Sequence, residues 1–497
     1  MNYPLLFRTV KHLKLTQVIY QVKNRLIKPA YVALDAPNGD SGFRIQVSGL
    51  KTEPIVRYNS WDGEHFTFLN LKHEFAGWNF TENGMLWAYN QNYFDWINQE
   101  GIEQEECCLW IDKFIEELPG NRIGLDPYPI ALRSINWIKF FCQYPKSATK
   151  ARLNSLYSQL CLLEKKLEFH LLGNHLLEDA YALYIGSAFF RDERLLKKAT
   201  NLLLSQLKEQ VLPDGAHYEQ SVMYHCILLD RLLDAINVGE RCAVNGIELR
   251  RYAERMLGHL ESIVWCNGDI LMANDAAHGI APMPAEIFDY ARRLGIKWNV
   301  IPLKECGYRK LQGELLEAIV DVGNITATYQ PGHTHADTFN YELRIDGLPF
   351  VVDTGISTYN KTERRQLERS TFAHNCVSVD GKNSSEVWGG FRVGRRCQSK
   401  IIVDSMHQIE AYHNGFRKKC WRKFSMNDKG IVVEDRYDGE AVSYIHLAEG
   451  ADIKRVTIEG ALMVDVKPWE YSTSYNQFHK GKVMEIHFKG HLRYTIQ

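Results

Sequence analysis

This sequence of 497 residues has almost no net charge. Its 59 lysines and arginines are balanced by 60 aspartates and glutamates, which leaves a formal charge of −1. Such a balance creates no general field for nucleic acid, so a charged ligand would have to be bound by a local patch. The sequence also lacks a run of about 18 apolar residues, the length that a membrane-spanning helix requires. We therefore expect neither nucleic-acid binding nor a transmembrane segment.

Cysteine gives no sign of a disulfide framework. The 11 cysteines are an odd number, are spread along the chain and show no Cys-X-X-Cys spacing. A reducing compartment fits this usage better than an oxidising one. The N-terminal stretch "MNYPLLFRTVKHLKLTQVIYQVKNRLIKP" also lacks the continuous apolar core and small-residue cleavage site of a signal peptide. We therefore expect a cytoplasmic protein.

The same N-terminal stretch is basic and contains no acidic residue. Its cationic residues are Arg8, Lys11, Lys14, Lys23, Arg25 and Lys28. A basic amphipathic helix can make peripheral contact with a membrane surface, but an ordinary helix docked on protein with a solvated outer face explains the pattern as well. Both interpretations remain open from the sequence.

The length predicts two or three domains, and the middle of the chain is helical. From about residue 103 to 300, apolar residues recur at steps of three and four. Segments with this period include 105–119, 128–144, 149–171, 175–190, 193–211, 219–238, 246–265 and 284–295. Short turns with Gly or Pro join them, which indicates stacked antiparallel hairpins. Because no clean sequence repeat is present, an incomplete toroid of hairpins fits better than a regular solenoid.

After residue 310 the apolar period becomes two, which is typical of strands. The runs are "ELLEAIVDVGNITATYQ", "FNYELRIDGLPFVVDTG", "HNCVSVDGKN", "SKIIVDSMHQIEAYH", "KGIVVEDRYDG" and "KVMEIHFKGHLRYTI". The Asp-Gly pairs of "IDGL", "VDGK" and "YDGE" predict turns. Many strands at short spacing indicate an antiparallel β-sandwich. We therefore predict an α+β multidomain protein: an N-terminal segment (1–100), an (α/α) toroid (101–308) and a β-sandwich (309–497). The interface between the last two is the expected place for a cleft.

Two polar clusters lie in the helical part. "GNHLLEDAYALYIGSAFF" places Asn174 and His175 at the opening turn of a helix. A plain N-cap would account for Asn174 but not for the adjacent histidine. In "LPDGAHYEQSVMYH", Glu219 is followed by Ser221 and Tyr224, which are three apart and so share one face near the start of the helix expected over 219–238. Taken alone, a buried hydrogen-bonded tyrosine explains Tyr224 better than a catalytic one.

A third cluster, "HTHAD", is expected at a strand end, where His333 and His335 would point the same way. The two imidazoles could share a metal, or one could bind metal while the other faces a substrate. Asp353, at the end of the next expected strand, could return beside His335 through a hairpin. The spacing alone leaves a polar turn without metal open as well.

The fourth cluster is basic and aromatic. It runs from Arg364 to Arg396 and also contains His374. Solvated surface charge is the ordinary explanation for such arginines. In a chain without net charge, however, this is the one evident local field for carboxylate or sulfate groups. The candidate substrate-binding residues are Glu219, Arg364, Arg369, Arg392 and Arg396.

Together, these clusters resemble the heparinase II/III family of polysaccharide lyases and its alginate lyase relatives. The matching stretches are "YPIALRSINW", "GNHLLED", "DGAHYEQSVMYH", "NDAAHG", "HTHADTFNYEL", "DTGISTYN" and "RSTFAHNCVSVDGKNSSEVWGGFRVGRR". They occur in the family's order over roughly 128–396. The resemblance implies an incomplete toroid followed by a β-sandwich, with a substrate groove between them. It also implies β-elimination at a uronic acid residue of an acidic polysaccharide.

The resemblance also implies roles for individual residues. Asn174 and His175 would contact the uronate carboxylate, so that the neighbouring C5 proton can be removed. Tyr224 would protonate the departing glycosidic oxygen, and His333 would be the base for one C5 epimer; for the other epimer, tyrosine would serve as both base and acid. A structural zinc ion would be held by His335, Asp353 and His374.

Two other functions compete with this one. A non-catalytic glycan-binding or polysaccharide-assembly protein on the same fold would explain the missing export signal, although such a protein would not need the full catalytic set. A zinc hydrolase using "HTHAD" fits the surrounding segments less well. The sequence does not choose between heparin, heparan sulfate, alginate and a bacterial exopolysaccharide, and it gives neither endo or exo action nor the oligomeric state.

Overall fold

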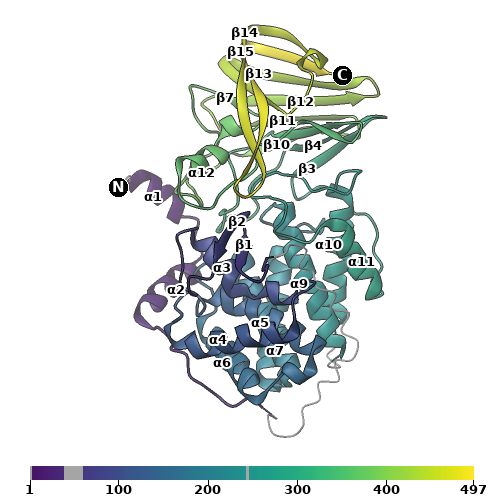
Figure 1. Ribbon diagram of the computed structural model, residues 1–497. Coiled ribbons are helices and arrows are strands. Elements are labelled where there is room, and N and C mark those ends of the chain that lie inside the picture. The colour runs from purple at the N-terminus through teal and green to yellow at the C-terminus, as the bar shows by residue number, and fades with distance from the viewer. Residues whose placement is uncertain (1–2, 38–59, 242–245) are drawn as a thin grey trace.

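The computed structural model describes residues 3–37, 60–241 and 246–497. Helices form the lower body in Figure 1 and strands form the upper one. The change falls between α11 (Pro284–Arg293) and β3 (Tyr308–Gln312). This arrangement confirms the predicted order of a helical domain followed by an antiparallel β domain.

Long helices joined by short turns build the lower body. They are α3 (Met85–Tyr93), α4 (Gln104–Glu117), α5 (Pro127–Gln143), α6 (Lys150–Lys166), α7 (Gly173–Phe190), α8 (Glu193–Gln210), α9 (Val222–Arg241), α10 (Ile247–Ile263) and α11. Chain neighbours pack in pairs, as in α5 with α6 and α9 with α10. The predicted segments agree with these bounds to within a few residues. The largest difference is at α6, which ends at Lys166 and is followed by turns in which Leu171 and Leu172 donate to the carbonyl of Glu168.

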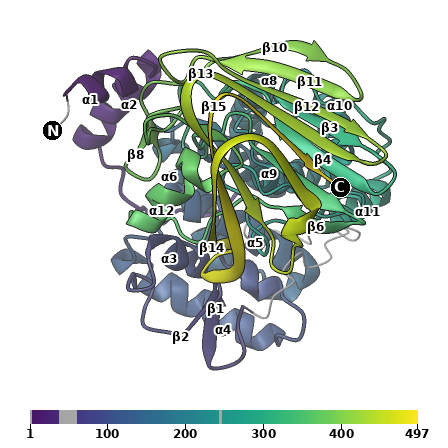
Figure 2. The same ribbon diagram turned by 90° about the horizontal axis from the view of Figure 1, so that it is seen from above.

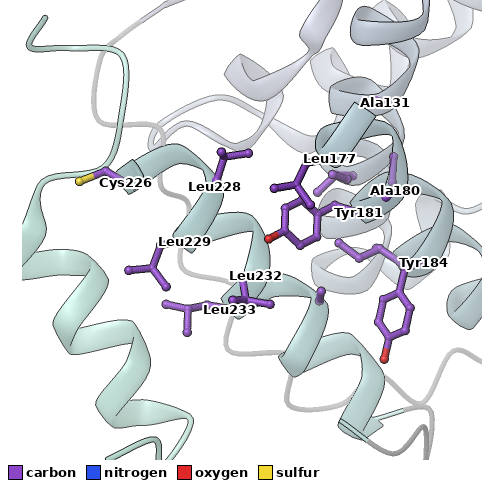
Figure 3. Close-up of a cluster of buried hydrophobic side chains, with 14 of the residues drawn as sticks. Ala131, Leu177, Ala180, Tyr181, Tyr184, Cys226, Leu228, Leu229, Leu232 and Leu233 are labelled. Atoms are coloured by element: carbon purple, nitrogen blue, oxygen red, sulfur yellow. The ribbon is translucent and has the colours of Figure 1, made fainter. Parts of the chain in front are cut away.

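The centre of this body is α7, which packs against α5, α8 and α9. Nearly every one of its side chains is buried, as expected for a helix that is apolar on all sides. Figure 3 shows Leu177, Ala180 and Tyr181 on the side of the cluster that faces the leucines of α9. Because α7 is enclosed on every side, its first turn is held in a fixed place.

In the N-terminal segment, α1 (Tyr3–Val10) and α2 (Leu15–Leu26) lie at one edge of the molecule in both views (Figures 1 and 2). The segment also contains a hairpin of β1 (His65–Phe68) and β2 (Leu71–Glu74). Arg8 Nε lies 2.7 Å from Glu386 Oε2, which ties α1 to the β domain. Over the described ranges, no helix has the length and apolar character needed to cross a bilayer.

A single curled antiparallel sheet forms most of the upper body. It contains β4 (Leu316–Asp321), β5 (Tyr341–Ile345), β6 (Leu348–Val351), β7 (Val377–Ser378), β10 (Ser399–Asp404), β11 (Gln408–His413), β12 (Cys420–Asn427), β13 (Gly430–Leu447), β14 (Val456–Ser474) and β15 (Gln477–Ile496), together with β3. A short helix, α12 (Glu363–Glu368), and the small pair β8 (Val387–Trp388) and β9 (Arg392–Val393) lie beside it. β13 pairs with β12 on one side and with β15 on the other, so it joins the layers of the curled sheet.

Three details differ from the sequence predictions. "YDGE" is not a turn: β13 continues through it with a bulge between Tyr437 and Glu440, and Gly439 has a φ of 154°. "HTHAD" does not lie at a strand end, because it belongs to the loop between β4 and β5. Asn174 is not the N-cap of α7, which is Leu172. The turns at "IDGL" and "VDGK" are present, with positive φ at both Asp and Gly.

Candidate active site

A cavity of about 710 Å³ lies where the helical body meets the β domain. Its wall contains Asn174, His175, Tyr224 and His333, the residues predicted to be catalytic. They come from the first turns of α7 and α9 and from the loop between β4 and β5. The rings of Tyr224 and His333 have centroids 4.0 Å apart. Segments that are distant in the chain therefore place an amide, a phenol and two imidazoles around one space.

Asn174 is held by a carboxylate rather than acting as a helix cap. Its backbone N–H donates to Glu219 Oε1 at 2.8 Å, and its side-chain Nδ2 donates to Glu219 Oε2 at 2.9 Å. Glu219 thereby satisfies a free N–H of the helix start. A Cβ at Gly173 would lie 2.6 Å from Glu219 Oε1, which explains the glycine before Asn174. Glu219, expected to bind substrate, is buried here and fixes the direction of the amide.

His175 is one of the cationic groups of the cavity wall. Its Nδ1 lies 3.1 Å from Glu168 Oε2, and its ring packs on Tyr128. Burial alone would lower the pKa of His175, but the carboxylate of Glu168 outweighs burial and the pKa is raised. The imidazolium form is therefore favoured beside Asn174, at the positive end of the α7 dipole.

Tyr224 is placed to give a proton. Its hydroxyl lies 3.2 Å from that of Tyr359, which in turn lies 3.3 Å from His333 Nδ1. Burial raises the pKa of Tyr224 above its ordinary value, so the phenol keeps its proton at neutral pH. Without a bound substrate, the arrangement favours Tyr224 as an acid over Tyr224 as a base.

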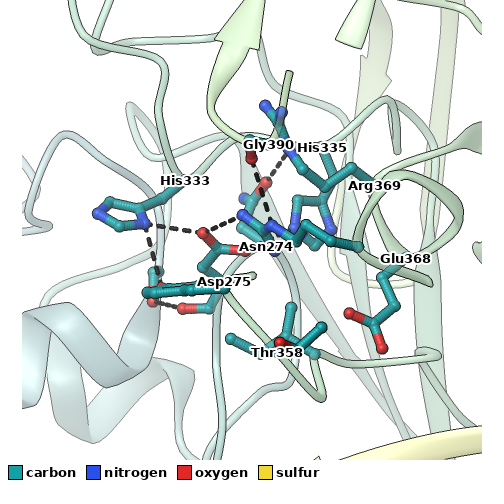
Figure 4. A network of polar contacts seen from close by, with 12 residues as sticks. Asn274, Asp275, His333, His335, Thr358, Glu368, Arg369 and Gly390 are labelled. Carbon is teal, nitrogen blue, oxygen red and sulfur yellow. Dashed lines mark hydrogen bonds and ion pairs between the residues drawn. The ribbon is translucent and has the colours of Figure 1, made fainter. Parts of the chain in front are cut away.

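Asp275 connects the two histidines of "HTHAD" (Figure 4). Its carboxylate oxygens lie 2.8 Å from His333 Nδ1 and 2.8 Å from His335 Nε2, and Arg365 binds both oxygens at 2.5 and 2.7 Å. Burial opposes ionisation of Asp275, but Arg365 and the histidines hold its pKa well below the usual range. Because a carboxylate only accepts, Nδ1 of His333 carries a proton and Nε2 is directed toward Asn174 Nδ2, 3.3 Å away.

The predicted substrate-binding arginines divide into two groups. Arg392 and Arg396 line the cavity. Arg369 is fully buried and donates to the backbone carbonyl of Thr334, so the structure places it in the core and not in the groove. Arg364 pairs with Glu368 outside the cavity wall.

Sequence reasoning gave no role to Glu168, Asp275, Tyr359 or Arg365, although each lies in or beside a stretch that had been singled out. Asp275 is in "NDAAHG", Tyr359 is in "DTGISTYN" and Glu168 precedes "GNHLLED". These partners could have been sought in the sequence, because a histidine or an asparagine that faces a cavity needs a buried partner to hold its orientation.

The three residues predicted to bind zinc lie in one buried region. His374 Nδ1 is 2.9 Å from Asp353 Oδ2, and the rings of His335 and His374 have centroids 5.2 Å apart. Within the described chain, His335 Nδ1 has no hydrogen-bond partner, so one of its ring nitrogens is free to coordinate an ion. The ligand atoms of these three residues do not all lie within 4.8 Å of one another. Among the described residues, other groups of side chains meet that distance condition. Two imidazoles and a carboxylate form a donor set that suits zinc.

Two family models match this chain. The heparinase II/III N-terminus model matches residues 141–264, and the heparinase II/III-like C-terminal model matches residues 296–473. A curated protein named heparin-sulfate lyase, from Pedobacter heparinus, is 25% identical over 304 residues, which cover 54% of this chain. The match spans only 45% of that protein's length.

Solved structures agree on the fold. A heparinase III aligns with a TM-score of 0.63 over 100% of this chain and 92% of its own, at 14% identity. A mutant heparan sulfate lyase of Pedobacter heparinus aligns with a TM-score of 0.59 over 97% of this chain and 87% of its own, at 15% identity. At such identities the likeness shows the shared toroid-plus-sandwich fold alone. With both of the family's models matched in order over more than half of its length, the chain belongs to the heparinase II/III family.

Proposed function

We propose that this protein is a polysaccharide lyase that cleaves an acidic, uronic-acid-containing polysaccharide by β-elimination. The observation that carries the proposal is the convergence of Asn174, His175, Tyr224 and His333 on one cavity. The relative named heparin-sulfate lyase supports the same reaction class and places glycosaminoglycans among the substrates to be tested first.

The first requirement of the reaction is to neutralise the uronate carboxylate, because a second negative charge must develop beside it. Asn174 and the imidazolium of His175 supply a donor and a positive charge at the start of α7. Arg392 and Arg396 add positive charge to the same wall. The carboxylate would compete for the Nδ2 hydrogens of Asn174 that Glu219 and His333 now share.

The second requirement is to move two protons. Nε2 of His333 takes the C5 proton, the C4–O bond breaks as the C4–C5 double bond forms, and Tyr224 gives its proton to the leaving oxygen. Asp275 stabilises the imidazolium that forms on His333. For the opposite C5 epimer, Tyr224 would serve as base and acid, which requires the bound substrate to lower its pKa.

The direct test is the ultraviolet absorbance of unsaturated products when the folded protein is mixed with heparin, heparan sulfate, chondroitin sulfate, hyaluronate, alginate and acidic bacterial exopolysaccharides. We expect a new absorbance with at least one of them. Binding of a glycan without any product would instead support a non-catalytic glycan-binding or assembly protein. Products without the double bond would indicate a hydrolase.

We also propose that His335, Asp353 and His374 hold a structural zinc ion. The free Nδ1 of His335 and the hydrogen bond from its Nε2 to Asp275 fit the usual pattern, in which a second carboxylate orients a ligating histidine. The ion would stabilise the β domain beside the cavity. Elemental analysis of the purified protein, compared with His335→Ala, tests the proposal; equal zinc in both would contradict it.

We further propose that α1 and α2 make a peripheral contact with a membrane. On α2 the polar face points inward, with Gln17 buried and Asn24 paired with His170. The outward face is apolar, and it is formed by Leu15, Val18, Ile19, Val22 and Leu26. An exposed apolar face with basic neighbours suits an anionic bilayer.

The cysteines of the described ranges are all free thiols, which supports a cytoplasmic location as part of this proposal.

A further inference from the structure

A second group of metal-ligating side chains lies outside the cavity, at the junction of the helical body and the β domain. Asp214 follows α8, His259 is on α10, and Cys306 is in the segment that enters β3. All three are buried, at 3%, 3% and 1% exposure. One ligand atom from each lies within 4.8 Å of the other two.

The hydrogen bonds of this group leave a ring nitrogen unexplained. Asp214 Oδ2 accepts from the backbone N–H groups of Lys304 and Cys306, at 3.0 and 2.9 Å. Within the described part of the chain, His259 Nδ1 is buried and has no hydrogen-bond partner. A buried ring nitrogen without a partner is costly, and the imidazole that carries it has a ring nitrogen within 4.8 Å of a carboxylate oxygen and a sulfur, which are both electron-pair donors.

We propose that Asp214, His259 and Cys306 form a site for a divalent transition-metal ion, with zinc as its occupant. Carboxylate, imidazole and thiolate are the three ligand types that zinc takes from proteins. The sulfur disfavours magnesium and calcium, which require oxygen ligands. On binding, the thiol of Cys306 would lose its proton to solvent and its sulfur would become the ligand.

The position of the site indicates a structural role. The turn that carries Asp214 packs tightly on α10, since a Cβ at Gly215 would lie 2.1 Å from the carbonyl oxygen of Arg255. The backbone of the segment entering β3 donates to Asp214. An ion here would join the turn after α8, the helix α10 and the first residues of the β domain. The cavity wall is made of other residues, so the site is independent of the proposed lyase reaction.

Cobalt substitution distinguishes this site from the one proposed at His335, Asp353 and His374, which has no sulfur. The purified protein, stripped with a chelator and reloaded with Co²⁺, should show a near-ultraviolet thiolate-to-cobalt charge-transfer band. Cys306→Ser and His259→Gln should each lose the band and about one equivalent of bound metal. Two matched controls, Cys397→Ser at another buried cysteine and His335→Ala, should keep the band.

The wild-type protein alone can overturn the proposal, whether or not the variants fold. Absence of the charge-transfer band from the cobalt-loaded wild-type protein would exclude a thiolate ligand. A band that persists in both Cys306→Ser and His259→Gln would assign the metal to another cysteine. Glycan cleavage is not part of the readout, so failure here leaves the proposed function unaffected.

Discussion

Three of the four groups assigned to the reaction each contact a buried carboxylate. The pairs are Asn174–Glu219, His175–Glu168 and His333–Asp275. The carboxylates fix which atom of each group faces the cavity and, for His333, which nitrogen carries the proton. Such positioning lets the groups act without reorganising during the reaction.

Removing the phenol hydroxyl of the proposed acid should abolish most turnover. We expect Tyr224→Phe to lower kcat by roughly 100-fold to 10,000-fold, the usual contribution of a general acid, with little change in stability. The measurement is product absorbance on the best substrate from the glycan panel. Tyr157→Phe is the control, because it removes a hydroxyl that donates to Asp192 and lies outside the cavity wall. Unchanged turnover in Tyr224→Phe would remove this tyrosine from the mechanism.

The raised pKa of His175 predicts an alkaline limit to activity. The positive charge of the imidazole is present below its pKa in the folded protein and is lost as the pH rises through that value. Glu168→Gln removes the carboxylate that raises the pKa, so the alkaline limb of kcat/KM should move to lower pH. Glu164→Gln, at a surface glutamate paired with Arg194, should leave the limb in place. An unmoved limb in Glu168→Gln would contradict this account.

The sequence revealed the groups that face the cavity but not the groups behind them. Asn174, His175, Tyr224 and His333 were found because short motifs carry them. Their carboxylate partners lie up to 58 residues away in the chain, as for Asp275 and His333, and only the fold brings them together. Burial also separated the arginines: Arg369 looks like a surface charge in the sequence but lies in the core.

Among the elements, helices were predicted better than strands. The helical period is set by burial of one face and survives a few polar residues. β12 was not predicted, because one of its inward positions is Arg422, which pairs with the buried Asp435 and interrupts the apolar alternation. β14 was also missed, although apolar residues alternate along it at Val456, Ile458, Leu462, Val464 and Val466; most of its side chains are partly or fully exposed.

The outward face of α2 leads to a prediction at the scale of one element. We expect the protein to sediment with vesicles that contain phosphatidylserine, and less with neutral vesicles or at high salt. The double substitution Ile19→Ser and Val22→Ser should weaken vesicle binding by about tenfold or more, because it removes two exposed apolar side chains. Leu109→Ser, at an exposed leucine on α4, should have little effect.

A different result would assign the same face to another partner. If the wild-type protein ignores anionic vesicles and instead forms a dimer that the double substitution disrupts, the face is a contact between copies of the chain. Sedimentation equilibrium of both proteins makes that distinction.

At the scale of the whole molecule, Asp275 links the helical body to the β domain. It lies between α10 and α11 on the helical side, and its partners His333, His335 and Arg365 all belong to the β side. Breaking a buried ion pair by removing one partner typically costs about 3–5 kcal/mol. We therefore expect Asp275→Asn to lower both activity and the free energy of unfolding, the latter measured by denaturant titration.

The control for this prediction is Asp438→Asn, which removes a charge from an exposed pair with Lys418. Exposed pairs contribute little, so this variant should unfold at the wild-type denaturant concentration. If Asp275→Asn also unfolds at the wild-type denaturant concentration, other contacts hold the two bodies together.

The long strand β13 has a consequence for how the protein is made. Its partners β6 and β12 precede it in the chain, whereas β15, which covers its other side along most of its length, is reached only at residues 477–496. During synthesis the ribosome must therefore deliver the chain as far as β15 before that side can be covered. Until then, the edge of β13 that pairs with β15 stays exposed in the nascent chain, and chaperone binding during translation is expected to concentrate there.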